Sequence, residues 1–264
     1  MKRTDLFCES GIIDTEEYSK NVHKGEAYGT EYTDMNISPD TGKRYGIKPG
    51  RYVTLYTDKG SVKNCLTDIL SGMLPPGSAL AAGLGNENIG SDSLGVKALR
   101  HIPATAHLSG HSDFTDLGMR SVYVLETGVT GKTGIESSSR AAFTARYVGA
   151  DVIIAIDSLA CADIERLCSV IQLTDTGISP GSGVGNDRKA LDRETAGIPV
   201  IAIGVPTVID LDSVSDIAAD RGFMVTPRNI DVLTDKFAEI IGIAVSRALN
   251  PTLSEQELKA LSLL

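Results

Sequence analysis

The segment Val152-Ile153-Ile154-Ala155-Ile156-Asp157 is a run of five apolar residues that ends in an acidic one. Such a run is typical of a strand buried on both faces, as in the parallel sheets of α/β proteins. In open parallel sheets, ligands bind beyond the carboxyl ends of the strands. The segment therefore predicts an α/β fold with Asp157 at a functional edge.

Strands and helices are predicted to alternate on both sides of this segment. Further apolar runs predict strands at 78–84, 122–125, 170–173 and 199–204. Apolar residues at helical spacing predict helices at 62–73 and 135–148 and from Pro227 to residue 248, where Thr226 would be the N-cap. This order predicts a doubly wound, mainly parallel sheet with helices on both faces.

Length and composition limit the domain organisation. The 264 residues are 42% hydrophobic, which is enough to bury the core of one large α/β domain, assigned here to residues 51–264. Within it, residues 51–57 alternate polar and apolar side chains and predict a strand at an edge or surface. Residues 1–50 show no sustained periodicity and are predicted to form a loosely structured N-terminal arm.

Charge and hydropathy exclude several classes of protein. The formal charge of −9 comes without any basic patch, which argues against direct nucleic-acid binding. No apolar stretch reaches the roughly 18 to 20 residues of a membrane span, and Met1-Lys2-Arg3 is followed by polar residues rather than a signal core. The four cysteines lack paired spacing and are predicted to be reduced thiols. We therefore expect a cytoplasmic protein whose partners are proteins or small molecules.

One motif points to nucleotide binding. Thr130-Gly131-Lys132-Thr133 lies between a predicted strand and a predicted helix, as in a P-loop. The P-loop pattern requires glycine where this chain has Glu126, whose carboxylate would repel phosphate. Gly83-Leu84-Gly85 begins a dinucleotide fingerprint, but Asn88 stands at its third glycine position. A P-loop-like nucleotide-binding protein is therefore a disfavoured alternative.

Two segments are expected to approach Asp157. The Gly85-Asn86 turn leads to a helix predicted from about Ser91, with Asp92 in its first turn. The glycine-rich run 177–186 predicts a close approach of its backbone to a peptide or an oxyanion. Together these segments predict a cleft whose substrate contacts come from Gly85, Asn86, Gly181, Ser182, Gly183 and Asn186.

A set of motifs then resembles one known family. These motifs are Arg3-Thr4-Asp5-Leu6, Gly50 to Leu55, Gly83 to Asn86 with Asp92, Thr133-Gly134-Ile135-Glu136, Ile154 to Asp157, Gly177 to Asn186, Gly197 to Thr207 and Met224 to Pro227. Together they resemble the germination protease (spore protease) family of endospore-forming bacteria. The resemblance covers most of the chain from residue 50 and is most specific between residues 130 and 210.

The resemblance implies an atypical aspartic endopeptidase with a fold similar to that of hydrogenase-maturation peptidases. Its catalytic residues would be Asp92 and Asp157, it would need no cofactor, and its substrates would be small acid-soluble spore proteins in the forespore and spore core. It also implies a homo-oligomer, by family resemblance a tetramer. Finally, it implies a zymogen cut in an exposed terminal arm near Asp5, Leu6 and Phe7.

The chain also departs from this family. Relatives carry a long insertion between the segments that match residues 210 and 224, and it is nearly absent here. Many relatives have histidine where this chain has Ser179, and few residues precede Arg3. These departures concern regulation and oligomer contacts more than the chemistry of the two aspartates.

The residues leave three kinds of activity open. Two close carboxylates share one proton, so that one can activate a water while the other polarises the scissile carbonyl. The same carboxylates could instead bind a divalent cation together with His101 or Glu136, as in a metallopeptidase. The third alternative is a non-catalytic binding protein on the same fold.

Overall fold

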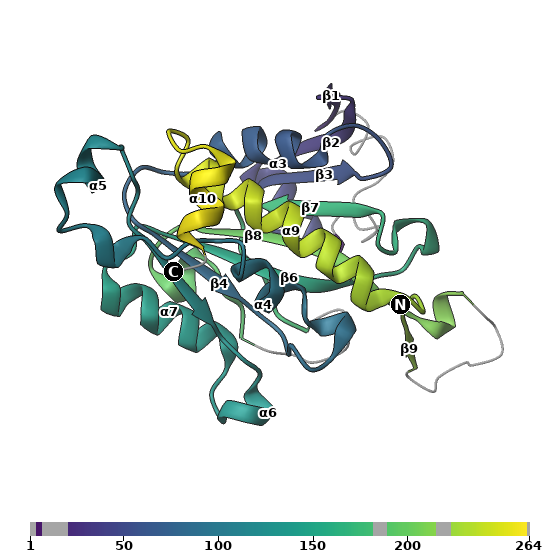
Figure 1. The fold of residues 1–264 in the computed structure, drawn as a ribbon. Helices are drawn as coiled ribbons and strands as arrows, with labels where there is room; N and C mark the ends of the chain where they lie inside the picture. The colour runs from purple at the N-terminus through teal and green to yellow at the C-terminus, as the bar shows by residue number, and fades with distance from the viewer. Residues whose placement is uncertain (1–3, 7–20, 182–188, 215–222, 263–264) are drawn as a thin grey trace.

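The computed structural model describes residues 4–6, 21–181, 189–214 and 223–262 of the chain. They form one sheet of nine strands with helices on both faces (Figure 1). The strand order is β1-β2-β3-β7-β8-β6-β4-β5, and β9 pairs with β8. Within these ranges, no helix is long and apolar enough to cross a membrane. The predicted α/β class is confirmed.

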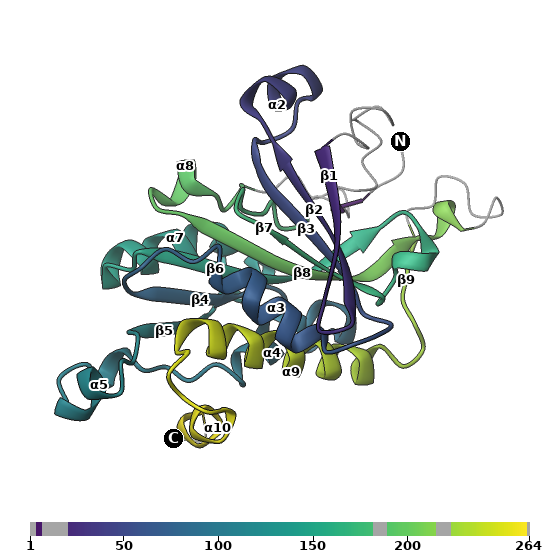
Figure 2. The same ribbon diagram turned by 90° about the horizontal axis from the view of Figure 1, so that it is seen from above.

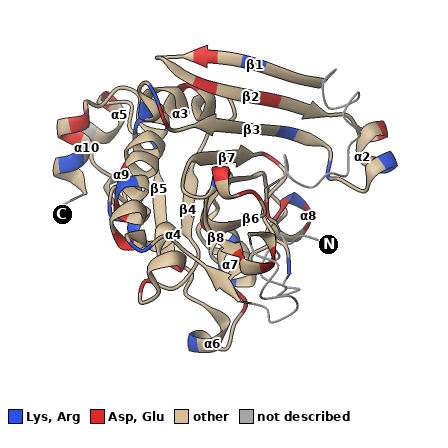
Figure 3. Ribbon diagram, turned by 90° about the vertical axis from the view of Figure 1, so that its right-hand side faces the viewer, with Lys and Arg blue, Asp and Glu red and all other residues tan. Residues whose placement is uncertain are grey.

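One half of the sheet is parallel, as predicted. It consists of four neighbouring strands: β5 (Val122–Glu126), β4 (Ala79–Gly83), β6 (Val152–Cys161) and β8 (Val200–Asp210). Asp157 is the one charged residue within β6, and the buried strands of this half carry few charges (Figure 3). β4 stops at Gly83, which pairs with Ile156, so β6 has an open edge from Asp157 onward.

The other half of the sheet is antiparallel, so the prediction of a mainly parallel, doubly wound sheet is wrong there. Its strands are β7 (Val170–Thr174), β3 (Gly50–Tyr56), β2 (Thr30–Ile37) and β1 (Val22–Ala27), and the short β9 (Met224–Val225) also pairs antiparallel. The link from β6 to β7 holds a 3-10 turn, Ile164–Arg166, and is too short for the helical crossover that a parallel connection requires.

Residues 21–50 are not a loosely structured arm. β1 and β2 form a hairpin whose two turn residues, Tyr28 and Gly29, have φ angles of 56° and 74°. This left-handed pair matches the twist of the flanking strands. The hairpin places β3 in the interior of the sheet rather than at an edge, and in Figure 2 its strands cross the parallel half steeply, as accumulated sheet twist dictates.

The helices divide between the two faces because side chains alternate along β6. Ile154 and Ile156 belong to the core under α3 (Val62–Ser71), α4 (Leu94–Leu99) and α9 (Ile230–Leu249). Ile153 and Ala155 belong to the core under α7 (Ser137–Val148) and α8 (Arg193–Ala196). The remaining helices are α2 (Pro39–Tyr45), α5 (Ser112–Asp116), α6 (Thr130–Thr133) and α10 (Glu255–Leu261).

One helix boundary differs from the prediction. α9 begins at Ile230 rather than at Pro227 and has Asn229 as its N-cap. The Thr226 hydroxyl instead donates a hydrogen bond of 2.7 Å to the carbonyl oxygen of Thr207 on β8. A side chain predicted to begin the helix therefore anchors the chain to the sheet before the helix starts.

A glycine brings α4 directly against the sheet. A Cβ atom on Gly95 would lie 2.3 Å from the carbonyl oxygen of Ile156 and 2.5 Å from that of Leu84. No side chain fits there, so the backbone of α4 rests on the end of β4 and on the middle of β6. This contact sets the position of the residues just before α4, among them Asp92.

Candidate active site

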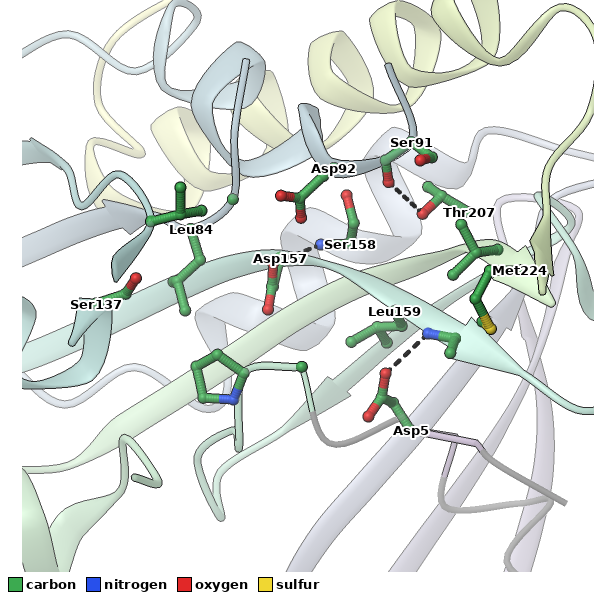
Figure 4. Close-up of a pocket in the computed structure, with 16 residues that line it drawn as sticks. Asp5, Leu84, Ser91, Asp92, Ser137, Asp157, Ser158, Leu159, Thr207 and Met224 are labelled. Carbon is green, nitrogen blue, oxygen red and sulfur yellow. Dashed lines mark hydrogen bonds between the residues drawn. The ribbon is translucent and has the colours of Figure 1, made fainter. Parts of the chain in front are cut away.

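A pocket of about 280 Å³ opens where β4 ends and β6 continues. Both aspartates of the predicted pair border it, together with the first part of the glycine-rich run (Figure 4). The lining residues are Asp5, Leu84, Gly85, Ser91, Asp92, Val129, Ser137, Asp157, Ser158, Leu159, Ala160, Pro180, Gly181, Thr207, Val208 and Met224.

Asp157 lies within β6, not at its end, because the strand continues to Cys161. Its side chain is buried, and the residue is only 5% exposed. Its Oδ1 accepts a hydrogen bond of 2.8 Å from the backbone N–H of Ser158. The functional edge is therefore set by the early end of β4, which opens the space beside Asp157.

Asp92 lies in a 3-10 turn, Gly90–Asp92, rather than in the helix predicted from Ser91. Its backbone is fixed on both sides: its N–H donates to the carbonyl oxygen of Ile89, and its own carbonyl oxygen accepts from Asn86, both at 2.8 Å. The connection from the turn to α4 holds this segment over the end of β4.

Gly85 and Asn86 both contact the backbone carbonyl oxygen of Asp92. Gly85 borders the pocket with a φ of +97°, and a Cβ atom there would lie 2.1 Å from the carbonyl oxygen of Asp92. Asn86 donates its backbone N–H to the same oxygen. Both residues were predicted to contact substrate, which stays a prediction; in the structure both contact the backbone of Asp92.

The two aspartates approach the pocket from different directions. In Figure 4, Asp92 and the Ser158 side chain lie on one side of β6, and the Asp157 carboxyl group extends toward the other. The pocket thus surrounds the open edge of β6, and both carboxyl groups border it. Ser158 was not among the predicted site residues, and it borders the pocket beside both aspartates.

The glycine-rich run contributes to two pockets. Pro180 and Gly181 border the first, and a substrate contact of Gly181 stays a prediction. Gly177, Ile178 and Ser179 border a second pocket of about 220 Å³, which shares Asp5 and Leu159 with the first. The other predicted contacts of this run lie outside the described residues: Ser182, Gly183 and Asn186.

The second pocket is bordered by Lys48 and Tyr52 on its far side. Lys48 pairs with Asp192, and Tyr52 donates a hydrogen bond of 2.8 Å to the backbone carbonyl of Lys48. Burial raises the pKa of Tyr52, so its phenol stays neutral and can donate. This pocket is therefore bordered by a neutral phenol and an ammonium group, whereas the first is bordered by the carboxyl groups of Asp92 and Asp157.

The N-terminal segment binds the open edge of β6. The backbone N–H of Asp5 donates to the carbonyl oxygen of Ala160 at 2.9 Å, and the Ala160 N–H donates to Oδ2 of Asp5 at 2.8 Å. Leu6 is 1% exposed and packs in a small core with Leu159 and Ile209. The expected exposed arm is thus wrong for residues 4–6, because tertiary contacts hold them; Phe7 lies outside the described residues.

The structure does not bring the predicted metal ligands together. His101 borders a separate pocket with Glu239 and Lys259, and burial lowers its pKa. Glu136 is the N-cap of α7 and does not border the pocket of the aspartates. In the part of the chain that the structure describes, no three His, Cys, Asp or Glu side chains are grouped so as to hold a metal ion.

The P-loop-like motif forms α6 at the end of β5. Glu126 and Lys132 are exposed, and of residues 126–133 only Val129 borders the pocket. The carboxylate of Glu126 occupies the position where a phosphate loop needs a glycine. The geometry gives no support to a nucleotide site at this motif.

The chain also matches a known family. A family model described as germination protease matches residues 14–221, well over half of the chain. The chain belongs to the germination protease family. This confirms the resemblance drawn from the motifs, and it is a family of peptidases.

Curated relatives named germination protease agree with this assignment. The Bacillus cereus (strain G9842) protein is 37% identical over 241 residues, and the Geobacillus sp. (strain WCH70) protein is 35% identical over 246. The chain spans 66% of the length of each, just under two thirds, and 83% of the chain is covered.

A Clostridium tetani (strain Massachusetts / E88) relative is covered more fully. It is 32% identical over 322 residues, which is 98% of both chains. That alignment is longer than the 264 residues of this chain, so the relative carries segments that have no counterpart here. This difference in length agrees with the expectation that this chain lacks an insertion carried by its relatives.

Proposed function

We propose that this protein is an endopeptidase that begins the degradation of small acid-soluble spore proteins during germination, with Asp92 and Asp157 activating a water. One observation carries the proposal: both carboxyl groups border a pocket at a strand edge that already binds an extended peptide segment. Strand addition at a sheet edge is a common mode of peptide recognition. Membership in the germination protease family supports a peptidase role in germination, and the resemblance drawn from the motifs implies the substrate class.

The peptide would bind with its scissile carbonyl between the carboxyl groups. In this mechanism the two carboxyl groups approach each other at the edge of β6 and share one proton, because two close carboxyl groups do not both ionise readily. The ionised member takes a proton from the attacking water, and the protonated member polarises the carbonyl and then protonates the leaving amine. The backbone N–H of Ser158, already directed at Oδ1 of Asp157, favours the ionised form of that carboxyl group.

The remaining features of the proposal come from the resemblance. We infer that the protein acts in the cytoplasm of the forespore and spore core, forms a homo-oligomer, by family resemblance a tetramer, and shares its fold with hydrogenase-maturation peptidases. We also infer that it cuts its own N-terminal segment near Asp5, Leu6 and Phe7. Such a cut requires residues 4–6 to leave the edge of β6, because a bound backbone resists cleavage.

Nearly isosteric substitutions test the two carboxyl groups. Asp92→Asn and Asp157→Asn are each expected to lower kcat on a purified small acid-soluble spore protein by roughly 100-fold or more, because each removes a proton-transfer group. All variants are first incubated under the same mildly acidic conditions, so that any N-terminal processing precedes the assay. Full activity in either variant contradicts the dyad.

A third aspartate gives the matched control. Asp210 is buried on the neighbouring strand β8, where its Oδ1 accepts from the N–H of Asp212, and it does not border the pocket. Asp210→Asn should therefore keep kcat within about twofold of the parent chain. A loss equal to that of Asp157→Asn would show that these substitutions act through the fold rather than through the chemistry.

Chelation separates the dyad from the metallopeptidase alternative. A carboxyl dyad needs no ion, whereas a metal site loses its activated water when the ion is removed. Prolonged dialysis against a chelator is expected to leave the rate of cleavage unchanged. If activity disappears and returns with zinc or another divalent cation, the metal alternative holds, and His101 and Glu136 are the first ligands to test.

A further inference from the structure

The Ser158 hydroxyl is buried at the pocket of the two aspartates. Its Oγ is inaccessible to solvent and has no hydrogen-bond partner among the described residues. The backbone of Ser158 is fixed, because its N–H donates to Oδ1 of Asp157 and its strand pairs with Val205 of β8. A buried hydroxyl without a partner is destabilising, so the Ser158 hydroxyl does not contribute to the stability of the fold.

The direction of the side chain points to Asp92. Successive side chains on β6 alternate, so Ser158 faces the side that carries α4 and α9, where Asp92 also lies (Figure 4). On the neighbouring strand, the Thr207 hydroxyl donates to the carbonyl oxygen of Ser91 at 2.6 Å and so holds the 3-10 turn of Asp92. Thr207 therefore holds the backbone of this turn. The Ser158 hydroxyl remains available for a hydrogen bond to a side chain of the turn.

A nucleophilic role for Ser158 lacks a base. Activation of a serine requires a neighbouring group that accepts its proton, most often a histidine or a lysine. No histidine or lysine is found among the described residues that border this pocket. The remaining role for the Ser158 hydroxyl is that of a hydrogen-bond donor.

We propose that Ser158 is a positioning residue that donates a hydrogen bond to the carboxyl group of Asp92 when a peptide occupies the pocket. This inference rests on the proposed peptidase function. The bond holds the carboxyl group of Asp92 in the orientation that proton transfer needs, while the backbone N–H of the same residue holds Asp157. Ser158 thus links the two aspartates through one residue of β6.

Two substitutions at Ser158 test the inference. Ser158→Ala is expected to lower kcat by roughly 10- to 100-fold, the worth of one hydrogen bond to a charged group, with KM changed less than about twofold. Its Tm should be unchanged or higher, because the variant loses a buried hydroxyl that has no partner. Ser158→Thr keeps the hydroxyl and should recover most of kcat. Full activity in Ser158→Ala, or a lower Tm together with the lost activity, overturns the proposal.

Ser138 provides a matched control on α7. Its hydroxyl is also buried without a partner among the described residues, but it does not border the pocket. Ser138→Ala should leave kcat unchanged and change Tm as Ser158→Ala does. An equal loss of kcat in both variants would show that removing any buried hydroxyl disturbs the enzyme, and would overturn a specific role for Ser158.

Asp157→Asn measured in the same series distinguishes the two proposals. If it is inactive while Ser158→Ala is fully active, the dyad stands and the role of Ser158 fails. If Asp157→Asn is itself fully active, the proposed function fails and the role of Ser158 fails with it.

Discussion

Gly85 determines where the backbone of Asp92 can lie. It combines a left-handed φ of +97° with a contact that leaves no space for a Cβ atom. We expect Gly85→Ala to destabilise the protein by more than the roughly 1 kcal/mol of a strained φ, and to lower kcat at least about tenfold, because Asp92 must shift. Chemical unfolding and kinetics on the spore protein measure both effects.

Gly134 is the control for this substitution. It has a φ of +69°, but nothing lies within 4 Å of the position of its Cβ atom. Gly134→Ala should therefore cost only the backbone strain of about 1 kcal/mol and leave kcat unchanged. If the two variants lose the same stability and have the same kcat, the close contact of Gly85 with Asp92 has no effect on function.

Individual residues of the site could be predicted only where a motif contains them. Asp157 was predicted at a functional edge from the apolar run before it, its pairing with Asp92 in catalysis was implied by the family resemblance, and the structure brings both to one pocket. Asp5 was predicted only as part of an exposed cleavage segment and Ser158 was not predicted, yet both border the same pocket. Asp5 is 155 residues from its partner Ala160, and the contact depends on where β4 ends, which no local pattern encodes.

At the scale of elements, a capping interaction joins α8 to the segment before β3. The Asp192 side chain accepts from the N–H of Thr195 at 2.9 Å in a capping box and also pairs with Lys48. Burial favours its neutral form, but the hydrogen bonds from Lys48 and Thr195 outweigh this and lower the pKa of Asp192.

This arrangement predicts a pH-dependent contribution to stability. Because the pKa is lower in the folded state, the stabilisation is present above the unfolded pKa of about 3.9 and is lost as the pH falls through the folded value. Asp192→Asn should be less stable than the parent chain by about 1 kcal/mol at pH 7, and the difference should shrink toward pH 3. Urea unfolding at several pH values measures it, with the exposed Asp40→Asn as the control; a constant difference contradicts the assignment.

Element types were predictable where periodicity is strong, and element ends were not. The helix predicted to end at residue 248 is present and ends at Leu249. β6 extends past Asp157 because β8 continues to pair with it, and α9 starts late because Thr226 bonds to β8. In both cases a partner distant in sequence sets the boundary.

At the scale of the whole molecule, the N-terminal segment connects processing to the site. Leu6→Ala is expected to release residues 4–6 from the edge of β6, because it removes buried contacts with Leu159 and Ile209. If the chain cuts itself near Asp5, Leu6 and Phe7, this release should accelerate a discrete loss of mass within residues 4–10 under mildly acidic conditions. Intact mass followed over time measures it. The same loss in the Leu6→Ala, Asp157→Asn double variant would show that another protease makes the cut.

The class of the fold followed from the parallel half alone. Its strands are continuous apolar runs, which can be recognised as buried strands from the sequence alone. In the antiparallel half, β3 and β7 were predicted as strands, but β1 and β2 were missed. These two strands are rich in charged and polar residues, and only a few residues such as Met35 and Ile37 mark their buried face. The hairpin is recognised only in the structure, where β2 pairs with β3.

The position of β7 between β3 and β8 has a consequence for synthesis on the ribosome. β1, β2 and β3 emerge in order and can pair at once, but the other neighbour of β3 begins only at Val170. At roughly 5 to 20 residues per second, the intervening chain takes about 6 to 25 seconds to appear. For that interval the far edge of β3 has unpaired backbone groups, and such an edge pairs readily with another chain. The nascent polypeptide, rather than the finished molecule, is the form in which this protein is most exposed to aggregation.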